Sequence, residues 1–353
     1  KIREELNPTE FLGYEFNKAE GVVLKISKGK EFIDEAKEGN EIELITNQTP
    51  FYGESGGQVG DLGVIKTSTG KIDVLDTQKK TGDLHIHVGK VSNGSIKVGE
   101  NVNLEIDVKK RKNARAYHSA THLLHEALRR TLGKHVTQKG SLVSPEKLRF
   151  DFSHNKPIEK SEITKIENLV NEMVSNSSDV KTRIMTPIEA VDKGALALFG
   201  EKYGDEVRVL SMGNENNKYF STELCGGTHV ANTSEIGKFR ITSQSSIASG
   251  VRRIEALRAD QLEEYEKNQK QSKSNQENKL IEEIKDIKKE LENLKIKSNY
   301  KTDLSSSENL KDLKKQLNRA NVKNIIKDKN KNIIKDNKVG DFTFRYQTIK
   351  NLP

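Results

Sequence analysis

The chain of 353 residues contains one cysteine, no tryptophan and no long apolar run. The single Cys225 excludes an internal disulfide and fits a reducing compartment. A membrane span needs about 18 consecutive apolar residues, so none is expected, and the opening KIREELNPTE lacks the apolar core of a signal peptide. We therefore expect a cytoplasmic protein. The opening residues are typical of the end of a helix, which predicts that the chain was cut from something longer.

Two signatures of hydrolases are also absent. No Gly-x-Ser-x-Gly elbow occurs, so a serine nucleophile of that kind is not expected. The His-Glu-x-x-His signature of metalloproteases is missing because Ser119 follows His118. Any hydrolytic chemistry must therefore come from other residues.

Charge is abundant but unevenly distributed. Charged residues make up 32% of the chain and hydrophobic residues only 33%, which predicts that part of the chain is elongated or solvated. Residues 1–260 hold 38 Lys and Arg against 37 Asp and Glu, whereas residues 261–353 hold 22 against 15. A basic tail is compatible with RNA as a partner, and equally with a well-solvated helix.

The first part of the chain has the pattern of a small β-barrel or sandwich. Short β-branched stretches alternate with Gly, Asn-Gly and Pro, namely GVVLKI, EIELIT, GVIKT, KIDVLD, LHIHVG and VNLEIDV. Between them, TPFYGESGGQVGDLG carries five glycines in the thirteen residues after Pro50. Such a loop lets the backbone approach a ligand closely, or it is a long loop with tight turns.

A helical period begins near Asn113 and opens an α+β region. A second helix is predicted over about 157–174, and strands at 148–154, 206–213, 218–227 and 237–257. The first helix carries apolar residues on one side and Gly133 as its C-cap: Tyr117, Ala120, Leu124, Ala127 and Leu128. We expect a barrel at 1–110 and an α+β core at 111–258.

The remaining residues predict a helical arm. Leucines and isoleucines repeat as in a coiled coil at Leu280, Ile284, Ile287, Leu291 and Leu294. Ser305 and Glu308 form a capping box before a second helix with Leu310, Leu313 and Leu317. We expect a helical hairpin over 259–338. FTFRYQTI alternates like a strand with no partner after it, so residues 339–353 are expected to begin a truncated domain.

Histidine and cysteine pairs point to a metal. His118 and His122 are four residues apart, so on a helix they project from one face, together with His125. Cys225 and His229 have the same spacing, separated by Gly226 and Gly227. A Cβ at the two glycines would hinder a tight turn.

Thiolate with imidazoles favours Zn²⁺ over Mg²⁺ or Ca²⁺, and the alternative is an inert buried thiol. Four ligands, His118, His122, Cys225 and His229, would close a structural site, whereas their wide separation in sequence suits a pocket. A zinc site in which one ligand exchanges would fit both the closed structural site and the pocket. His229 is the candidate for that ligand.

With these motifs the chain resembles the editing part of the alanyl-tRNA synthetases. The resemblance rests on HSATHLLHEAL, HVTQKGSLV, LRFDFSH, ELCGGTHV and FYGESGGQVGD, and it covers about residues 11–258. A related module occurs in threonyl-tRNA synthetases, whose cysteine motif typically reads Cys-Arg-Gly-Pro-His where this chain has CGGTH. The fold implied is α+β: a small barrel, a zinc-containing editing domain and a helical hairpin arm.

The resemblance implies roles for individual residues. The family's zinc ligands fall on His118, His122, Cys225 and His229, and Gln138 occupies the position that discriminates the amino acid. The catalytic candidates are Gln138, Cys225 and His125, the last a general base or a histidine that only packs beside the site. Candidates for substrate contacts are Glu54, Ser55, Gly56, Gly57, Gln58, Thr121, Arg149, Arg252 and Arg253, the arginines contacting tRNA phosphates or forming solvated salt bridges.

The activity implied is hydrolysis of tRNA for alanine that is mischarged with serine or glycine, as a module joined to an upstream aminoacylation domain. Such proofreading is needed because one small group gives only about 1–3 kcal/mol of discrimination. A stand-alone editing deacylase and a non-catalytic zinc module that binds RNA are the alternatives. The basic tail favours the latter, but no aromatic-rich strand face is visible.

Overall fold

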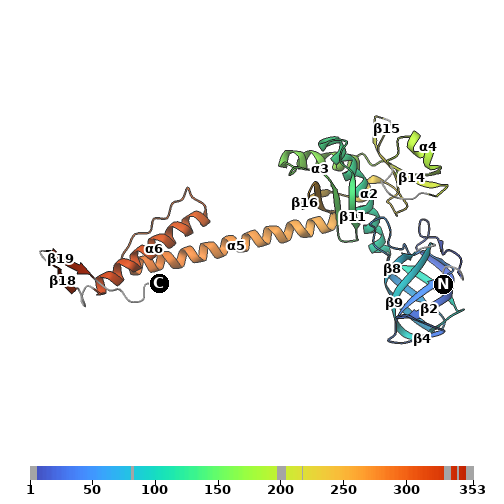
Figure 1. The fold of residues 1–353 in the computed structure, drawn as a ribbon, viewed down its shortest axis with the longest axis horizontal. Helices are drawn as coiled ribbons and strands as arrows, with labels where there is room; N and C mark the ends of the chain where they lie inside the picture. The colour runs from blue at the N-terminus through green and yellow to red at the C-terminus, as the bar shows by residue number, and fades with distance from the viewer. Residues whose placement is uncertain are drawn as a thin grey trace. The chain divides into compact units, whose positions relative to one another are not determined.

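The computed structural model describes residues 6–80, 83–196, 204–216, 218–329, 335–339 and 342–346. The chain divides into two compact units, residues 1–263 and 264–353. The first unit holds a β-barrel and an α+β core, and Figure 1 labels their elements. The predicted combination of an α+β fold with a small barrel is confirmed, because helices and antiparallel sheets occur together with a closed barrel.

Six antiparallel strands close the barrel in the order β10-β7-β8-β9-β5-β2, with β2 pairing back onto β10. They are β2 (Lys18–Lys28), β5 (Glu41–Thr46), β7 (Gly63–Lys66), β8 (Gly70–Lys80), β9 (Leu84–Lys97) and β10 (Asn101–Ile106). The short strands are β1 (Glu10–Phe11), β3 (Glu31–Ile33), β4 (Glu35–Lys37) and β6 (Gln48–Thr49). Each of the six predicted stretches overlaps one barrel strand, so that prediction is confirmed.

Alternation of side chains explains why these segments form a barrel. In β5 the residues Ile42 and Leu44 are buried while Glu41 and Glu43 are exposed, which is the period of a strand with one face in a core. The inward residues of all six strands share one hydrophobic cluster. The barrel is therefore a packed core in its own right.

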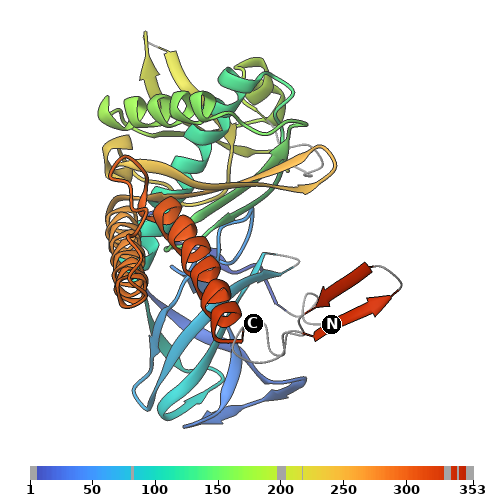
Figure 2. The ribbon, with the colours of Figure 1, turned by 90° about the vertical axis from the view of Figure 1, so that its left-hand side faces the viewer.

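A long helix, α2 (Val108–Leu132), leads from the barrel into the core (Figure 2). It begins earlier than the predicted Asn113, because Asp107 caps its first turn and accepts a hydrogen bond from the backbone N–H of Lys110. Its first turns carry basic rather than apolar side chains, so the apolar helical period begins only near Asn113. Arg111 is only 1% exposed and pairs with the equally buried Asp61.

The Arg111 guanidinium also donates to two barrel carbonyls, Gly13 O at 2.7 Å and Pro50 O at 2.8 Å. Asp61 in turn accepts from the backbone N–H of Tyr52 at 2.7 Å. A buried arginine needs such a full set of partners. This cluster fixes the start of α2 to the barrel.

The α+β core packs helices against two antiparallel sheets. One sheet has the order β11-β12-β17-β16 and the other β13-β14-β15. The strands are β11 (Gln138–Val143), β12 (Leu148–Ser153), β13 (Lys181–Met185), β14 (Val207–Glu215), β15 (Lys218–Leu224), β16 (Phe239–Ala248) and β17 (Val251–Arg258); the helices are α3 (Lys160–Ser175), α4 (Pro187–Asp192) and a 3₁₀ turn η1 (Thr233–Ile236). The apolar face of α2 joins α3 and the first sheet in one cluster, and Gly133 ends α2 as predicted.

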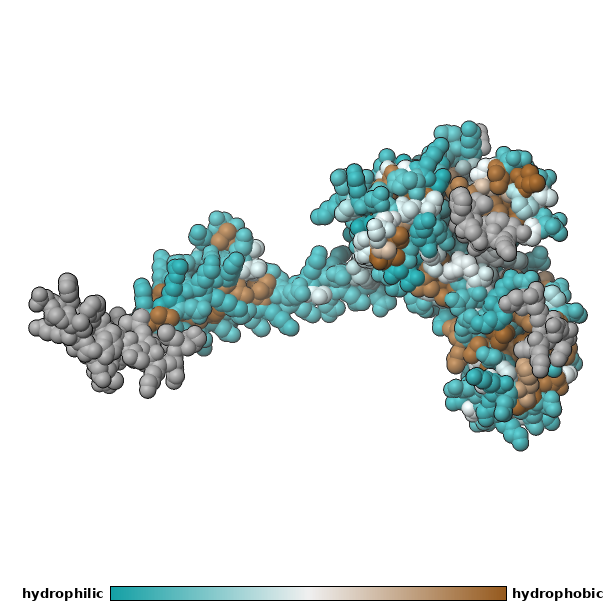
Figure 3. All heavy atoms as spheres, viewed as in Figure 1, coloured by the Kyte–Doolittle hydropathy of each residue, from teal (hydrophilic) through white to brown (hydrophobic). Residues whose placement is uncertain are grey.

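The second unit contains the predicted helical hairpin. In α5 (Ala259–Asn293) and α6 (Ser306–Lys329) the predicted seam residues pack in one cluster, with Ile284, Leu291 and Leu313 buried. Ser305 and Glu308 form the predicted capping box. The surface of the arm is mostly hydrophilic (Figure 3), which matches its charged composition.

The last strand is present as predicted, but the expectation that it has no partner was wrong. β19 (Phe342–Tyr346) does have a partner, but it precedes the strand: β18 (Lys335–Val339) pairs with it in antiparallel register, Lys335 opposite Tyr346. The predicted arm therefore ends before residue 335. A polar stretch, KDNKV, gives little strand signal of its own, and only pairing reveals it. The predictions for residues 347–353 and for the opening residues 1–5 concern residues outside those that the structure describes. In the described part of the chain no helix is long and apolar enough to cross a membrane.

Candidate metal centre and adjoining pocket

Helix α2 presents three buried histidines to one place. His118 and His122 lie one turn apart with their rings stacked, the centroids 5.2 Å from each other. His125 lies one turn closer to the end of the helix and is also buried. The packing of α2 between the sheets and the barrel hides this face from solvent. The helical spacing therefore produces the alignment predicted from the sequence.

The second pair comes from the turn after β15. Cys225 directly follows that strand, and Gly226, Gly227 and Thr228 lead to His229. Gly227 is needed for close approach: a Cβ there would lie 2.1 Å from His118 Cε1 and 2.4 Å from its Nδ1. At Gly226 a Cβ would meet only the Tyr14 hydroxyl, at 3.9 Å. The prediction that both glycines are needed therefore holds at 227 but not at 226.

The two pairs converge on one point. The four ligand atoms of His118, His122, Cys225 and His229 lie within 4.8 Å of one another. The Cys225 Sγ is 3.5 Å from His118 Nε2 and 3.2 Å from His229 Nε2. His122 Nε2 is buried and makes no hydrogen bond to the described residues. A buried imidazole nitrogen without a hydrogen-bond partner, facing the same point as a thiol, fits the donor set of a metal site.

The outer nitrogen of each imidazole is held by a different residue. His118 Nδ1 donates to Gln58 Oε1 at 2.8 Å, and His122 Nδ1 donates to Glu223 Oε2 at 2.8 Å. His229 Nδ1 lies 3.2 Å from the hydroxyl of Ser119. Partners on Nδ1 fix the ring orientation and leave Nε2 for a ligand bond, as in protein zinc sites. Of these three partners, sequence reasoning named only Gln58, and for substrate contact.

The protonation states of Cys225 and His229 suit metal binding. Burial lowers the pKa of His122, but Glu223 and Cys225 outweigh it and raise that pKa to about 10, so a metal would have to displace a proton from this imidazole. Burial alone raises the pKa of the Cys225 thiol, but the facing imidazoles of His118, His229 and His122 hold that pKa well below its usual value. Burial, followed by the neighbouring His118, lowers the pKa of His229 to about 3. A thiolate and a neutral imidazole are the forms that coordinate a metal. One sulfur and three nitrogens match the tetrahedral donor sets of Zn²⁺ and not the oxygen sets of Mg²⁺ or Ca²⁺.

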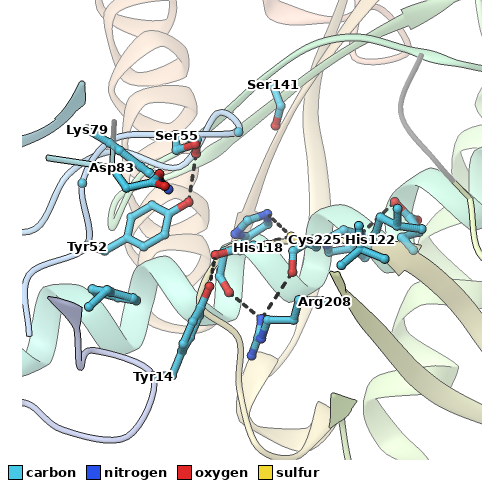
Figure 4. A pocket seen from close by; sticks show the side chains of 18 of the residues that line it. Tyr14, Tyr52, Ser55, Lys79, Asp83, His118, His122, Ser141, Arg208 and Cys225 are labelled. Atoms are coloured by element: carbon cyan, nitrogen blue, oxygen red, sulfur yellow. Dashed lines mark hydrogen bonds and ion pairs between the residues drawn. The ribbon is translucent and has the colours of Figure 1, made fainter. Parts of the chain in front are cut away.

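The cluster opens onto a pocket of about 590 Å³. Figure 4 shows Tyr14 and Tyr52 on one side of Cys225 and His122 on the other. The pocket is lined from the barrel, from β11 and from the turn after β15. The predicted site residues that line it are Ser55, Gly56, His118, Thr121, His122, His125, Gln138 and Cys225. A second group of predicted residues does not line it: Glu54, Gly57, Gln58, Arg149, Arg252, Arg253 and His229.

The glycine-rich loop joins the barrel to the core. Gly56 and Gly57 have φ of 57° and 86°, a region that glycine adopts without strain. Gly57 packs against Ser141 of β11, and the carbonyl of Gly57 accepts from Val143 N–H at 2.7 Å. Gln58 is fully buried. The loop therefore presents Ser55 and Gly56 to the pocket, and Gln58 supports His118 from behind.

The predicted arginines have protein partners away from the pocket. Arg253 makes two hydrogen bonds to Asp151, at 2.7 and 2.8 Å, and Arg252 donates to Gln244 at 3.0 Å. Arg149 Nε lies 3.9 Å from Asp151 Oδ2. Tyr14 and Arg208, which sequence reasoning missed, contact the CGG turn directly. Neither residue could be predicted as a site residue from the sequence, because neither belongs to a motif of recognisable spacing.

Glu223 is the most important site residue that was not predicted from the sequence. It is 4% exposed, and its carboxylate contacts His122 Nδ1 at 2.8 Å and His125 Nδ1 at 3.3 Å. It also accepts from the Ser221 hydroxyl at 3.0 Å. Its position two residues before Cys225 could have pointed to it, because residues i and i+2 of a strand share a face.

Comparison with known proteins agrees with this geometry. The family model "tRNA synthetases class II (A)" matches residues 1–110. The model "Threonyl and Alanyl tRNA synthetase second additional domain" matches residues 207–255, which include the CGG turn.

Three curated relatives carry the name alanine–tRNA ligase. The protein of Parvibaculum lavamentivorans is 54% identical over 264 residues, 74% of this chain and 30% of that protein. Those of Mesorhizobium japonicum and Rhizobium meliloti are 53% and 52% identical over 264 and 265 residues, covering 73% and 74% of this chain and 30% of each relative. The chain thus spans about 30% of the length of the curated relatives it matches. The resemblance drawn from the motifs is confirmed, and this chain is a relative of the alanyl-tRNA synthetases over about three quarters of its length.

Proposed function

We propose that this chain hydrolyses the ester of tRNA for alanine that has been mischarged with serine or glycine. The observation that carries the proposal is the convergence of His118, His122, Cys225 and His229 at the wall of a pocket that Gln138 also lines. Similarity to alanine–tRNA ligases supports the choice of tRNA. The partners are then tRNA for alanine and an aminoacylation domain of the same ligase.

The donor set fits zinc, and His118, His122, Cys225 and His229 would hold it. When bound, the ion supplies a positive charge that can polarise or orient a polar group of the substrate. The chain's own residues keep these ligands in place: Gln58 and Glu223 fix two of the imidazoles through Nδ1.

Gln138 is proposed to recognise the amino acid. It lies at the start of β11 and lines the pocket together with Ser55 and Gly56. An amide side chain offers both a donor and an acceptor, so it can bond to a serine hydroxyl. Alanine lacks that hydroxyl and would leave the amide unsatisfied. Glycine also lacks the hydroxyl, so this contact accounts for the selection of serine alone.

His125 is proposed to carry the proton. Its Nδ1 is held by Glu223, and its buried Nε2 has no hydrogen-bond partner among the described residues. In the reaction a water oxygen attacks the ester carbonyl, a water proton passes to His125 Nε2, and the same proton then goes to the departing ribose oxygen. The Glu223 carboxylate stabilises the imidazolium between these steps.

The architecture assigns a task to each part. We propose that residues 111–258 form the deacylase core, that the barrel of residues 1–110 closes one side of the pocket, and that the arm of α5 and α6 contacts tRNA through its basic charge. Arg149, Arg252 and Arg253 would contribute phosphate contacts through guanidinium N–H groups that their present carboxylate and amide partners do not use.

The test uses the purified chain with tRNA for alanine that carries labelled serine or labelled alanine. We expect release of serine to be faster than release of alanine, and the Cys225→Ala variant to lose the serine reaction. Gln138→Ala should reduce the ratio of serine to alanine release. Lys139→Gln is the matched control, since Lys139 is exposed and does not line the pocket. Equal release by Cys225→Ala and the parent chain would refute the proposal.

A non-catalytic zinc module that binds RNA is the alternative from another class, and the surplus of lysine and arginine in residues 261–353 favours it. It predicts binding of uncharged tRNA with a steep salt dependence and no release of serine. A stand-alone editing deacylase predicts the same release in the absence of any aminoacylation domain joined to the chain. Measuring release and salt dependence on the same preparation separates the RNA-binding module from both deacylase proposals, which predict the same release by the purified chain.

A further inference from the structure

A second, smaller cavity lies beside the metal cluster. Its volume is about 190 Å³, and it reaches His229, the predicted ligand that does not line the larger pocket. The start of α2, the segment before β2 and the residues that follow the CGG turn enclose it. Besides His229, its ionisable lining residues are Arg111, Lys112, Arg115 and Glu235. We call it the basic cavity.

The positive charges of the basic cavity come from one face of α2. Arg111 and Lys112 precede Arg115 by four and three residues, so the three side chains project from the same side of the helix. Asp61 neutralises Arg111. Lys112 is exposed and Arg115 is half-buried, and neither forms an ion pair with a carboxylate of the described residues. Within that part of the chain, two positive charges therefore line the cavity without an ionic partner.

Arg115 also has a buried N–H group that is not used. Its Nη2 donates to Gly13 O at 3.1 Å, but its Nε is buried and has no hydrogen-bond partner among the described residues. Burial, and then the nearby Arg111, lowers the pKa of Arg115, although a guanidinium stays charged at pH 7. A buried donor on a charged group is destabilising unless it finds an acceptor. An anion in the cavity would supply that acceptor and offset the charge.

Glu235 is the acidic residue of this lining, and its carboxylate already has donors. Its Oε1 accepts hydrogen bonds from the backbone N–H groups of Ala231 and Asn232, at 3.0 and 2.9 Å. The carboxylate therefore holds the chain that follows the CGG turn, and it is a single negative charge against the two cations Lys112 and Arg115. This balance favours a small anion over a cation.

We propose that the basic cavity binds one phosphate group through Arg115 and Lys112. Both side chains suit phosphate oxygens, and an arginine can offer two N–H groups at once. The volume is below the range of about 300–1,000 Å³ for drug-sized ligands, so it suits a single phosphate better than a whole nucleotide. The group is a backbone phosphate of RNA or a free inorganic phosphate, since both present the same oxygens. The proposal requires no hydrolysis and therefore stands apart from the proposed function.

The first test titrates inorganic phosphate into the full chain and follows binding by phosphorus NMR. Arg115→Gln and Lys112→Gln should each weaken binding by about tenfold or more, because each removes charge-assisted hydrogen bonds. Arg115→Lys, which keeps the charge, should weaken it less. Lys109→Gln is the matched control, since Lys109 is an exposed residue of the same helix that does not line the cavity. It should keep the parent affinity.

The second test measures binding of uncharged tRNA for alanine as a function of salt. If the phosphate belongs to RNA, Arg115→Gln and Lys112→Gln should each lower the slope of log affinity against log salt by about 0.7–0.9, while Lys109→Gln keeps it. An unchanged slope together with weaker binding of inorganic phosphate would retain the site and assign it to free phosphate.

Unchanged binding in both tests would overturn the proposal. Equal losses in Lys109→Gln would overturn it as well, because they would reflect net charge and not a site. Circular dichroism checks the fold of each variant. If Arg115→Gln does not fold, Lys112→Gln decides the outcome, since Lys112 is exposed and its replacement leaves the buried contacts of Arg115 in place.

Discussion

Replacing Gly227 with alanine should displace the His118 imidazole from the metal cluster without unfolding the protein. The added Cβ would lie 2.1 Å from His118 Cε1, whereas ordinary contacts are at 3.4 Å or more. The imidazole must therefore move by more than 1 Å, and Gln58 Oε1, at 3.2 Å from the new atom, crowds the same space. Metal sites tolerate deviations of only about 0.2 Å in ligand distance.

Loss of one ligand from four should weaken zinc binding strongly. We expect the dissociation constant to rise by about 100-fold or more, which corresponds to about 2.7 kcal/mol. Competition against a chromophoric chelator measures the constant, and circular dichroism checks the fold. The matched control is Gly226→Ala, because a Cβ there would meet only the Tyr14 hydroxyl, at 3.9 Å. It should bind zinc like the parent.

Two results would refute this reasoning. If Gly227→Ala binds zinc as tightly as the parent chain, His118 is not a ligand in the position that the structure gives it. If Gly226→Ala loses zinc to the same extent, the turn needs glycine for its flexibility and not for the close approach of one imidazole. Measuring both variants therefore separates contact from conformation.

Three further predictions concern other parts of the molecule. Glu223→Ala should reduce zinc affinity by about 10- to 100-fold, since it leaves His122 Nδ1 without its partner; unchanged chelator competition would show that Glu223 does not orient the ligand. Asp61→Ala should cost about 3–5 kcal/mol in the free energy of unfolding, because it leaves Arg111 buried and unpaired; a loss below about 1 kcal/mol in urea denaturation would contradict this. Leu313→Ala should cost about 2–5 kcal/mol and speed hydrogen exchange in α6 while exchange in α2 stays unchanged; equal effects in both helices would contradict the division into two units.

The sequence was most informative where a pattern is local. Strand alternation in the barrel, helical period in α2 and the heptad seam of α5 each depend on neighbours within a few residues. The metal ligands could also be predicted from local spacing, because His118 and His122 are four residues apart, as are Cys225 and His229. A local pair shows which side chains can meet, and the preference of zinc for a thiolate together with imidazoles indicated that the two pairs meet each other.

Residues that act through tertiary contacts left no such pattern. Glu223 holds two imidazoles from another element, and Tyr14 contacts Gly226 across 212 residues of chain. Gln58 was noted for its place in a glycine-rich loop, but its contact with His118 depends on how that loop packs against β11. The strand β18 was hidden for a related reason, since its residues are polar and only pairing with β19 makes them a strand.

The position of the metal cluster explains why the barrel and the core form one unit. The ligands of α2 depend on the barrel through Arg111, which anchors the start of the helix, and through Gln58, which orients His118. The ligands of the turn depend on the barrel through Gln58 again, which exchanges hydrogen bonds with Thr228 at 2.8 and 3.0 Å, and through Tyr14. A single amide thus bridges both ligand pairs, which lie about a hundred residues apart in sequence. Separating the barrel from the core would remove Gln58 from both ligand pairs, so metal binding and the barrel–core junction stabilise each other.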